Sequence, residues 1–536
     1  MADDKSIAAT RAKATARRAK RARGRKLDSE AAMIERRLAA AVRAGDEGPV
    51  LGRAKISYEM AERVSGVSHG GMGLIAQVVD HLGLAAAIDS GLDLLQAHRP
   101  YHESDHVLNI AYNTCCGGRH LDDIEARRND RVFSDALGVA SLPDPTTAGD
   151  FCRRFEPKDI WILQEAINTA RLRAWAAQGP DFVAGTARID VDATIVSTTG
   201  ECKEGMDISY KGDWGYSALV VSLANTSEPL YLDLHGANRP SHEGAPEALD
   251  KAIALCRKAG FEDILLRGDT DYSMTTRLDR WNADGIRFVF GYDAMTPLVF
   301  RAGAIEETEY HALVAKADAA RAKLLSETVG TAAVKKSRAK QPRVKDGIVA
   351  SRGYKKITTT AEDVVELTYR PRAAKTDYRM IALRKNLTIE VGGQETLFDQ
   401  YRYFFYITND WNMTPDQVVG EARQRCNQEN LHAQLKDMGA LSAPVGTLVA
   451  NHAYMIMASL AWSMKAWCAL LLPVHPRWSA KHRAEADKLL RMEFHTFRAA
   501  FIDIACQIVR GARKIRWRII AWNPWLRPFF RLADIL

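Results

Sequence analysis

The sequence contains no CxxC pair, no long apolar run and no apolar leader. Its eight cysteines are scattered, which argues against a structural zinc site and, without an export signal, fits reduced thiols in a cytosol. No stretch reaches the roughly 18 uncharged apolar residues of a membrane-spanning helix. The start of the chain also lacks the apolar core of a secretory signal. We therefore expect a cytoplasmic protein with no membrane partner.

The length and composition indicate an ordinary globular protein of several modules. At 536 residues the chain is too long for one compact core, so we expect three or more modules. Its 47% hydrophobic and 26% charged residues are typical of soluble proteins.

Positive charge gathers in three separate clusters, within a net charge of +8. Each cluster alone is interpreted either as a solvated tail or as a means of neutralising phosphates. Three clusters together favour a polyanionic partner. The clusters are residues 1–26, with ten Lys or Arg against two Asp, then Lys335, Lys336, Arg338, Lys340, Arg343 and Lys345, and finally Arg510, Arg513, Lys514, Arg516 and Arg518.

Hydrophobic periodicity divides the chain. The first 27 residues are expected to be disordered when free, and a helix is predicted over residues 29–43. Helical spacing persists from about residue 70 to 177, and period two begins at residue 187, which predicts a mixed α/β layout. The predicted domains are residues 1–60 (basic tail and helix), 61–180 (helical DNA-binding module), 181–300 (α/β unit, first part), 301–400 (β-rich insertion), 401–445 (α/β unit, second part) and 446–536 (C-terminal helical region).

The first strand of the α/β unit carries two acids. Residues 187–196 are rich in β-branched residues, which favour strands. Because side chains alternate between the faces of a strand, Asp190, Asp192 and Thr194 share one face. Burying two carboxylates is costly without a cation, and a divalent metal is the simplest one. The alternative is that the acids lie at a solvated strand end.

A second acid candidate follows a later strand. Asp269 lies in Leu265-Leu-Arg-Gly-Asp-Thr-Asp-Tyr272, just past the end of a predicted buried strand. In open α/β sheets, side chains at this position converge on ligand crevices. Gly268 permits a close approach of the backbone. Asp271 is the competing candidate.

A third candidate lies on a helix predicted over residues 414–439. The stretch Thr414-Pro-Asp-Gln417 is a capping box with proline at the first helical position, and the glycine at residue 439 is a suitable stop. On one continuous helix Arg425, Glu429 and Lys436 form a single stripe, within about 40° of one another. The alternative is an Arg425–Glu429 ion pair that only stabilises the helix.

In combination these features resemble the DDE transposases of bacterial insertion sequences, and more narrowly the insertion-sequence family numbered thirteen-eighty within the wider group numbered four. The resemblance covers most of residues 65–450. The spacing Arg425-x3-Glu429-x6-Lys436 matches the group's Tyr-x2-Arg-x3-Glu-x6-Lys signature, except that Ala422 replaces the tyrosine. Asp271 stands where glycine is usual. The other matching stretches are Ser68-His-Gly-Gly-Met-Gly73, Cys116-Gly-Gly-Arg119 followed by Asp122, Leu137-Gly138, residues 146–155, Asp190-Val-Asp-Ala-Thr194 and Leu265-Leu-Arg-Gly-Asp269.

The resemblance implies a ribonuclease H-like fold, a mixed sheet flanked by helices, in which Asp192, Asp269 and Glu429 hold two Mg²⁺ or Mn²⁺ ions. The family pattern places its first acid directly before a small residue and Thr, which favours Asp192 over Asp190. Two such ions stabilise both the attacking and the leaving oxygen of a phosphoryl displacement. Residues 181–300 and 401–445 would then form the catalytic domain.

The resemblance also implies the course of the reaction and the partners. Water nicks the DNA, the liberated 3′-hydroxyl transfers the strand, and the β-rich insertion helps to form a hairpin at the cut end. Arg425 and Lys436 would clamp the scissile phosphate. Trp411 is a candidate for stacking on a displaced base, although we favour its packing in the core. The implied partners are double-stranded DNA, as terminal inverted repeats and target, and a second copy in a homodimer assembled on DNA.

Two other function classes share parts of this pattern. A DNA-binding protein derived from a transposase but lacking catalysis would have no reason to keep the acids and the Arg/Lys pair at these spacings. A metal-dependent nuclease without strand transfer would share the site but lack the extra DNA-binding modules predicted at residues 1–180 and 446–536. A cleavage assay on inverted-repeat DNA with and without Mg²⁺ separates these classes.

Overall fold

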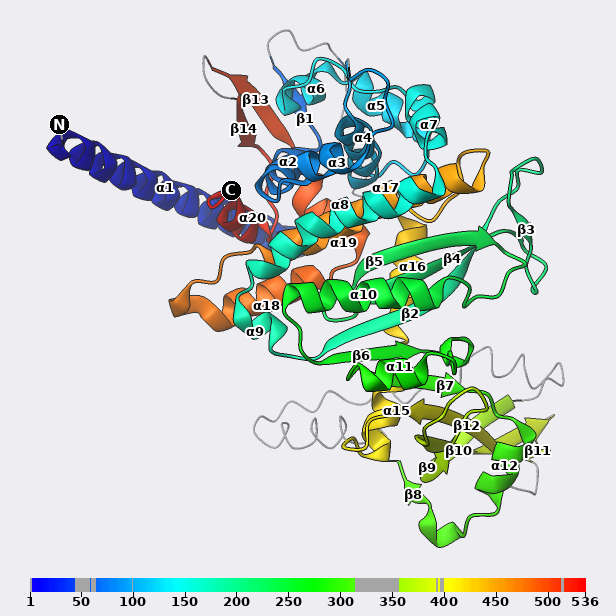
Figure 1. Cartoon of the computed structure of the whole chain (residues 1–536). Coiled ribbons are helices and arrows are strands. Elements are labelled where there is room, and N and C mark those ends of the chain that lie inside the picture. The colour runs from blue at the N-terminus through cyan, green and yellow to red at the C-terminus, as the bar shows by residue number, and fades with distance from the viewer. Residues whose placement is uncertain are drawn as a thin grey trace. The chain divides into compact units, whose positions relative to one another are not determined.

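The computed structural model describes residues 2–43, 58, 64–98, 100–313, 356–391, 394–395, 400–511 and 515–536. The chain divides into two compact units, whose elements are labelled in Figure 1. The helical unit comprises Met1–Gly179, Ser197–Gly205 and Ala433–Leu536, and the sheet unit comprises Pro180–Val196 and Met206–His432. The domain boundaries expected from the sequence stay predictions.

The core of the helical unit is built around α17 (Leu448–Leu470), in which every residue from Ala450 to Ala469 is buried. A helix with no exposed face is stable only when other elements surround it, and α17 packs against α4 (Glu103–Cys115) and α8 (Pro157–Ala176). No single described helix is long and apolar enough to cross a membrane, although the bent pair α2 and α3 meets that test by length and composition. The unit also contains α2 (Met72–His81), α3 (Leu84–Gly91), η1 (Leu121–Asp123), α5 (Ile124–Arg128), α6 (Arg131–Leu137), α7 (Pro145–Arg153), η5 (Pro476–Trp478), α18 (Ser479–Leu490), α19 (Phe494–Phe497), η6 (Arg498–Ile502) and α20 (Leu526–Ala533).

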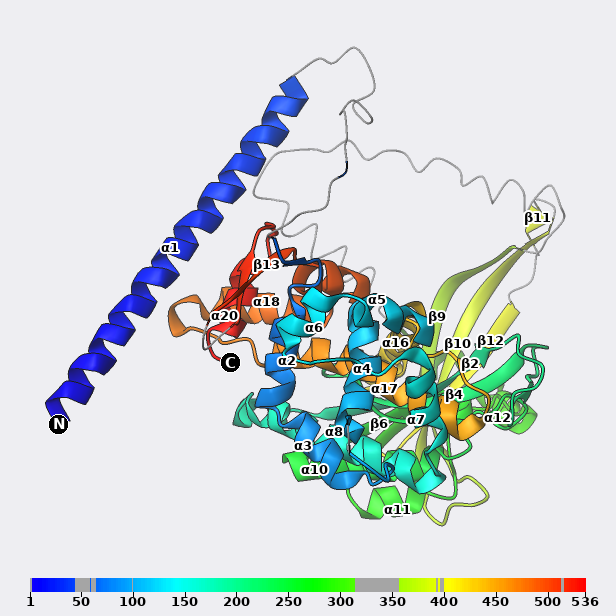
Figure 2. The same ribbon diagram turned by 90° about the horizontal axis from the view of Figure 1, so that it is seen from above.

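The basic N-terminal segment is helical. α1 spans Ala2–Arg43 as one long helix (Figure 2). Ala, Arg and Lys are strong helix formers, and Arg23 anchors the helix through two hydrogen bonds to Asp534, of 3.1 and 2.6 Å. The Arg23 guanidinium also lies 4.2 Å from the centre of the Phe530 ring. The expected disorder of residues 1–27 is therefore wrong, because composition alone did not reveal this docking partner.

The C-terminal region is not helical throughout, as the sequence interpretation had it. A small antiparallel sheet has the order β1 (Gly66–Val67), β13 (Cys506–Arg510) and β14 (Ile515–Ile519). Along β14, apolar residues alternate with the exposed Arg516 and Arg518, which is the period of a strand. The hairpin thus displays part of the third basic cluster.

The sheet unit contains a mixed sheet, as expected of a ribonuclease H-like fold. β5 (Glu228–Gly236) pairs antiparallel with β4 (Trp214–Leu223), and β4 lies beside β2 (Ala187–Ser197). On its other side β2 pairs parallel with β6 (Ile264–Gly268), which pairs parallel with β7 (Arg287–Tyr292). This confirms the predicted mixed α/β class. The unit also contains α10 (Ala245–Ala259), which packs on β4 and β5, with α9 (Pro180–Val183), β3 (Asp207–Ile208), η2 (Thr270–Tyr272), α11 (Leu278–Ala283), α12 (Thr296–Gly303) and η3 (Glu307–Glu309).

The β-rich segment that follows continues the same sheet. The long strands β9 (Lys356–Tyr369) and β10 (Tyr378–Val391) pair antiparallel, β10 pairs with β12 (Gln400–Thr408), and β12 pairs with β7. With β8 (His311–Ala312), β11 (Gln394–Glu395) and the strands β2 to β6, these strands form one sheet of 11 strands in the described part of the chain. The second basic cluster, residues 335–345, lies outside the described residues.

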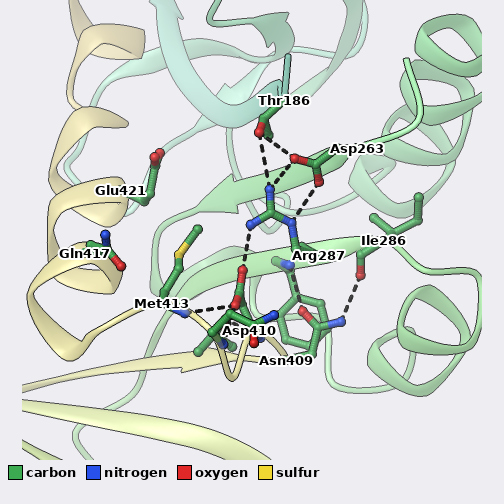
Figure 3. Close-up of polar contacts among 12 residues, drawn as sticks. Thr186, Asp263, Ile286, Arg287, Asn409, Asp410, Met413, Gln417 and Glu421 are labelled. Carbon is green, nitrogen blue, oxygen red and sulfur yellow. Dashed lines mark hydrogen bonds and ion pairs between the residues drawn. The ribbon is translucent and has the colours of Figure 1, made fainter. Parts of the chain in front are cut away.

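An arginine ties the beginnings of neighbouring strands to the end of β12 (Figure 3). Arg287 donates two hydrogen bonds to Asp263, of 2.8 and 2.6 Å, one of 2.6 Å to Asp410 and one of 3.3 Å to Thr186. Asp410 also accepts the N–H of Met413, ahead of α15 (Pro415–Gln424). Burial by itself would raise the pKa of Asp410, but hydrogen bonds from Arg287 and from backbone N–H groups outweigh it, so this pKa is lowered. The network therefore holds the segment that leads into α15 against the beginnings of these strands.

Candidate active site

The register of a parallel strand pair brings two of the predicted acids together. In the β2–β6 pair Asp190 lies opposite Arg267. Asp192 and Asp269 each follow two residues later, on the same face as their predecessors, because side chains alternate along a strand. The proximity of Asp269 also contributes to raising the pKa of Asp192. The two carboxylates therefore lie side by side where β6 ends.

One arginine compensates these two carboxylates only in part. Arg425 Nη1 donates a hydrogen bond of 3.0 Å to Asp192 Oδ2, and the two side chains are 13% and 16% exposed. Burial raises the pKa of Asp192 to about 6, against the lowering effect of Arg425. Burial likewise raises the pKa of Asp269; Arg425 lowers it, and Asp271 and Glu429 raise it further. A single guanidinium thus leaves the desolvated pair short of positive charge.

Asp190 belongs to a different network. Arg267 donates to both of its carboxylate oxygens, at 2.6 and 2.8 Å, and both side chains are only 2% exposed. The same guanidinium donates a hydrogen bond of 2.7 Å to Glu421 on α15, which also accepts from Arg188. Two separate sets of ion pairs therefore join α15 to the sheet. Arg267 links Asp190 to Glu421, and Arg425, at the end of α15, pairs with Asp192.

The predicted continuous helix over residues 414–439 is wrong. Thr414 caps α15 (Pro415–Gln424) through the expected capping box, but the helix ends there, and α16 (Asn427–Asp437) begins after a break. Gln428 explains the break, because its side chain donates to Val220 O at 2.9 Å and accepts from the Ser222 hydroxyl. These tertiary contacts and the Arg425–Asp192 pair override helix propensity.

The other candidates differ in burial and in their hydrogen bonds, and the N–H of Asp271 donates a hydrogen bond of 3.0 Å to Asp269. Glu429 is exposed in the first turn of α16 and lies near enough to raise the pKa of Asp269. Lys436 is exposed in the last turn of α16. Asp271 is exposed and accepts a hydrogen bond of 2.6 Å from Ser241. Trp411 is 57% exposed, so the expectation that it packs in the core is wrong.

Sequence reasoning missed three residues that shape the site. Arg267 and Glu421 join Asp190 to α15, and Tyr272 lies buried beside the acid pair, where burial and the nearby Asp192 and Asp269 raise its pKa. An arginine inside an otherwise apolar strand was a usable signal for Arg267, because charged residues are rarely buried without a partner. The sequence carried no comparable signal for Glu421 or Tyr272.

The acid pair suits a divalent cation. Asp192 and Asp269 offer hard carboxylate oxygens in a desolvated position, which is the donor chemistry that Mg²⁺ and Mn²⁺ prefer. Their raised pKa values show that a cation would stabilise their charged forms. Glu429 is the third acid within electrostatic reach.

A tighter cluster of ligand-type atoms lies elsewhere. Among the residues that the structure describes, Asp89, His102 and Glu103 alone have metal-ligating atoms all within 4.8 Å of one another. Asp89 accepts two hydrogen bonds from Ser104, and Glu103 accepts the N–H groups of two loop residues. These acids therefore already accept hydrogen bonds from the chain around α3 and α4. The ligand atoms of Asp192, Asp269 and Glu429 are more widely spaced.

Comparisons with known proteins found a family model and a solved structure. The model of the family described as transposase DDE domain group 1 matches residues 62–536. No curated protein matches the chain. Among solved structures, the chain is similar to a piggyBac transposase synaptic complex with hairpin DNA, determined by cryo-EM, with 10% identity, a TM-score of 0.31 and 81% of each chain covered. Since the family model covers most of its length, the chain belongs to the transposase DDE domain group 1 family.

Proposed function

We propose that this chain is the transposase of a bacterial insertion sequence of the thirteen-eighty family, and that it cleaves the ends of its element and transfers them to a target. The observation that supports the proposal is the register of β2 and β6, from which Asp192 and Asp269 follow as neighbours. Arg425 donates a hydrogen bond to Asp192. Desolvated paired carboxylates with a guanidinium are suited to phosphoryl transfer, because a phosphate oxyanion can take the place of a carboxylate at the arginine.

The side chains of the site divide the work. Asp192, Asp269 and Glu429 would hold two Mg²⁺ or Mn²⁺ ions, which supply charge stabilisation at the attacking and leaving oxygens. Arg425 orients a phosphate through its planar donors, and the buried Arg267–Glu421 pair holds α15, which ends at Arg425, against the sheet. Asp271 extends the acidic character of the site.

DNA is the partner that the charge distribution supports. Residues 13–22 of α1 are exposed and rich in Lys and Arg, and Arg516 and Arg518 are exposed on β14. Clustered cations of this kind neutralise successive phosphates. We extend the proposal to terminal inverted repeats as the substrate, a homodimer on DNA, a hairpin at the cut end, and stacking of Trp411 and contact of Lys436 with the displaced or scissile strand.

A cleavage assay tests the proposal. Duplex DNA bearing candidate inverted repeats is incubated with the protein and Mg²⁺, Mn²⁺ or EDTA, and nicked, hairpin and joined products are separated. We expect cleavage and joining with either metal and none with EDTA. Asp192→Asn should abolish both, whereas Asp213→Asn, which changes an exposed acid of the same unit, should not.

Each alternative has its own outcome. DNA binding without cleavage in any metal would indicate a binding protein that has lost catalysis. Cleavage without joined products would indicate a nuclease. Metal-dependent cleavage that persists in Asp192→Asn would contradict the site assignment.

A further inference from the structure

The helical unit contains a small cationic pocket that the catalytic proposal does not use. It has a volume of about 190 Å³, and its lining includes two arginines, Arg119 and Arg498, against one acid, Asp437. Gly117 of the Cys116-Gly-Gly-Arg119 stretch forms part of the wall. The pocket therefore gives a structural setting to a motif whose role the sequence did not reveal.

The pocket is built by close backbone approaches. Gly117 has φ +89°, and a Cβ there would collide with the guanidinium of Arg498. Gly439, at φ +76°, similarly leaves room for the backbone of Arg119. Arg498 opens the π-helical turn Arg498–Ile502 and is oriented by a hydrogen bond of 2.8 Å to Asp503. Single π-helical turns are frequent at functional sites.

The arginines of the pocket can exchange their present partners for an anion. Arg119 is 54% exposed and pairs at 3.1 Å with the carboxylate of Asp437, which is 68% exposed, and the same Nη2 also donates to the Asp437 carbonyl oxygen. Ion pairs this exposed are weak, because water screens them. Arg498 is 31% exposed and keeps donors beyond its single hydrogen bond to Asp503. Guanidinium groups match phosphate geometry with two donors each.

We propose that this pocket holds one backbone phosphate of DNA. The inference rests on the proposed function only in taking DNA as the partner. Arg119 and Arg498 would grip the phosphate oxygens, and Asp437 would be displaced from Arg119. A contact to phosphate alone fixes the position of the duplex and is independent of base sequence. Free inorganic phosphate has the same chemistry, so the test separates the two sources.

The test measures DNA affinity against salt in EDTA, where no cleavage occurs. Arg119→Gln should reduce the slope of log affinity against log salt by about one. The ratio of wild-type affinity to Arg119→Gln affinity should therefore fall about 3.5-fold as the salt concentration rises from 50 to 200 mM. Asp437→Asn should act in the opposite direction and tighten binding, because it removes the negative charge beside Arg119 and leaves that arginine bonded only to the neutral backbone carbonyl of residue 437. The matched control is Arg153→Gln, which removes an arginine of α7 that is 53% exposed and paired with Asp150 and lies outside the pocket lining.

Each result decides the matter. An unchanged slope in Arg119→Gln, or weaker binding in Asp437→Asn, overturns the proposal, and so does an equal effect of Arg153→Gln. Arg498→Gln should repeat the effect of Arg119→Gln, provided that hydrogen exchange shows the unit folded. Inorganic phosphate at about 10 mM is tested for slower hydrogen exchange at the pocket in the wild type and in Arg119→Gln. If it slows exchange only in the wild type while the salt dependence of DNA binding is the same in both, the pocket is a free-phosphate site and the DNA assignment falls. If the slopes behave as expected but no metal-dependent cleavage occurs, the pocket stands and the proposed function fails.

Discussion

The two acids of β2 should respond in opposite ways to the same substitution. Asp190→Asn removes the charge that Arg267 contacts through two hydrogen bonds in a site where both side chains are 2% exposed. Removing one partner of a buried pair costs about 3–5 kcal/mol. Because Arg267 keeps Glu421 at 2.7 Å, we expect the lower end, about 3 kcal/mol. This corresponds to roughly 100-fold faster exchange of the amides that open with this network.

Asp192→Asn should leave stability intact and abolish cleavage. Asp192 accepts one side-chain hydrogen bond, of 3.0 Å from Arg425, which an amide oxygen can also accept, whereas Asp190 accepts two from Arg267 in a nearly closed site. Hydrogen exchange by mass spectrometry, on peptides from β2 and β6 in EDTA, measures the local stability of both variants. The cleavage assay on the same preparations measures activity.

The comparison is within one strand, so the two variants control for each other. Fast exchange in Asp192→Asn with normal protection in Asp190→Asn would refute the division into a structural and a catalytic acid. Full cleavage by Asp192→Asn would refute it as well.

Three further predictions follow from other contacts. Glu429→Gln should lose metal-dependent cleavage, while its free energy of unfolding changes by no more than about 0.5 kcal/mol because the residue is exposed. Glu421→Gln, which breaks a buried pair, should instead lower the thermal midpoint. Normal cleavage by Glu429→Gln would remove that acid from the site. The pKa of Asp410 is lowered in the folded state, so its pairing with Arg287 stabilises the protein above the ordinary carboxyl pKa and is lost as the pH falls through the lowered value; thermal midpoints measured between neutral and acidic pH should fall less steeply in Asp410→Asn than in the wild type, and equal slopes would contradict the assignment. Deleting residues 2–26 should weaken DNA binding and its salt dependence while exchange protection in the sheet unit stays unchanged; salt slopes identical to those of the full chain would argue against a DNA role for α1.

Local patterns in the sequence predicted the elements that depend on local physics. Alternation marked β2, and the capping box at Thr414 marked the start of α15 to the residue. The position of Asp269 just past a buried strand was likewise readable. Each of these signals involves neighbours a few residues apart, which the sequence shows directly.

The features that the sequence did not predict depend on distant partners. The helix breaks after α15 because Gln428 reaches Val220 and Arg425 reaches Asp192, more than 200 residues away. The β-rich insertion joins the central sheet because β12 pairs with β7, and nothing in either strand names the other. The first part of α1, up to residue 27, was taken for a disordered tail because the aspartate that anchors it lies at residue 534.

The burial of α17 has a consequence for how the protein is made. α4 and α8 leave the ribosome well before their packing partner, because 272 residues separate Ala176 at the end of α8 from Leu448 at the start of α17. At the usual rate of synthesis, about 5–20 residues per second, this delay lasts roughly 15–55 s. During that interval the nascent helices expose the apolar faces that α17 later covers. The last described strand of the large sheet, β12, is complete at Thr408, 40 positions before Leu448. The newborn chain therefore passes through a period in which a completed sheet coexists with an open helical core, and chaperone capture should be strongest then.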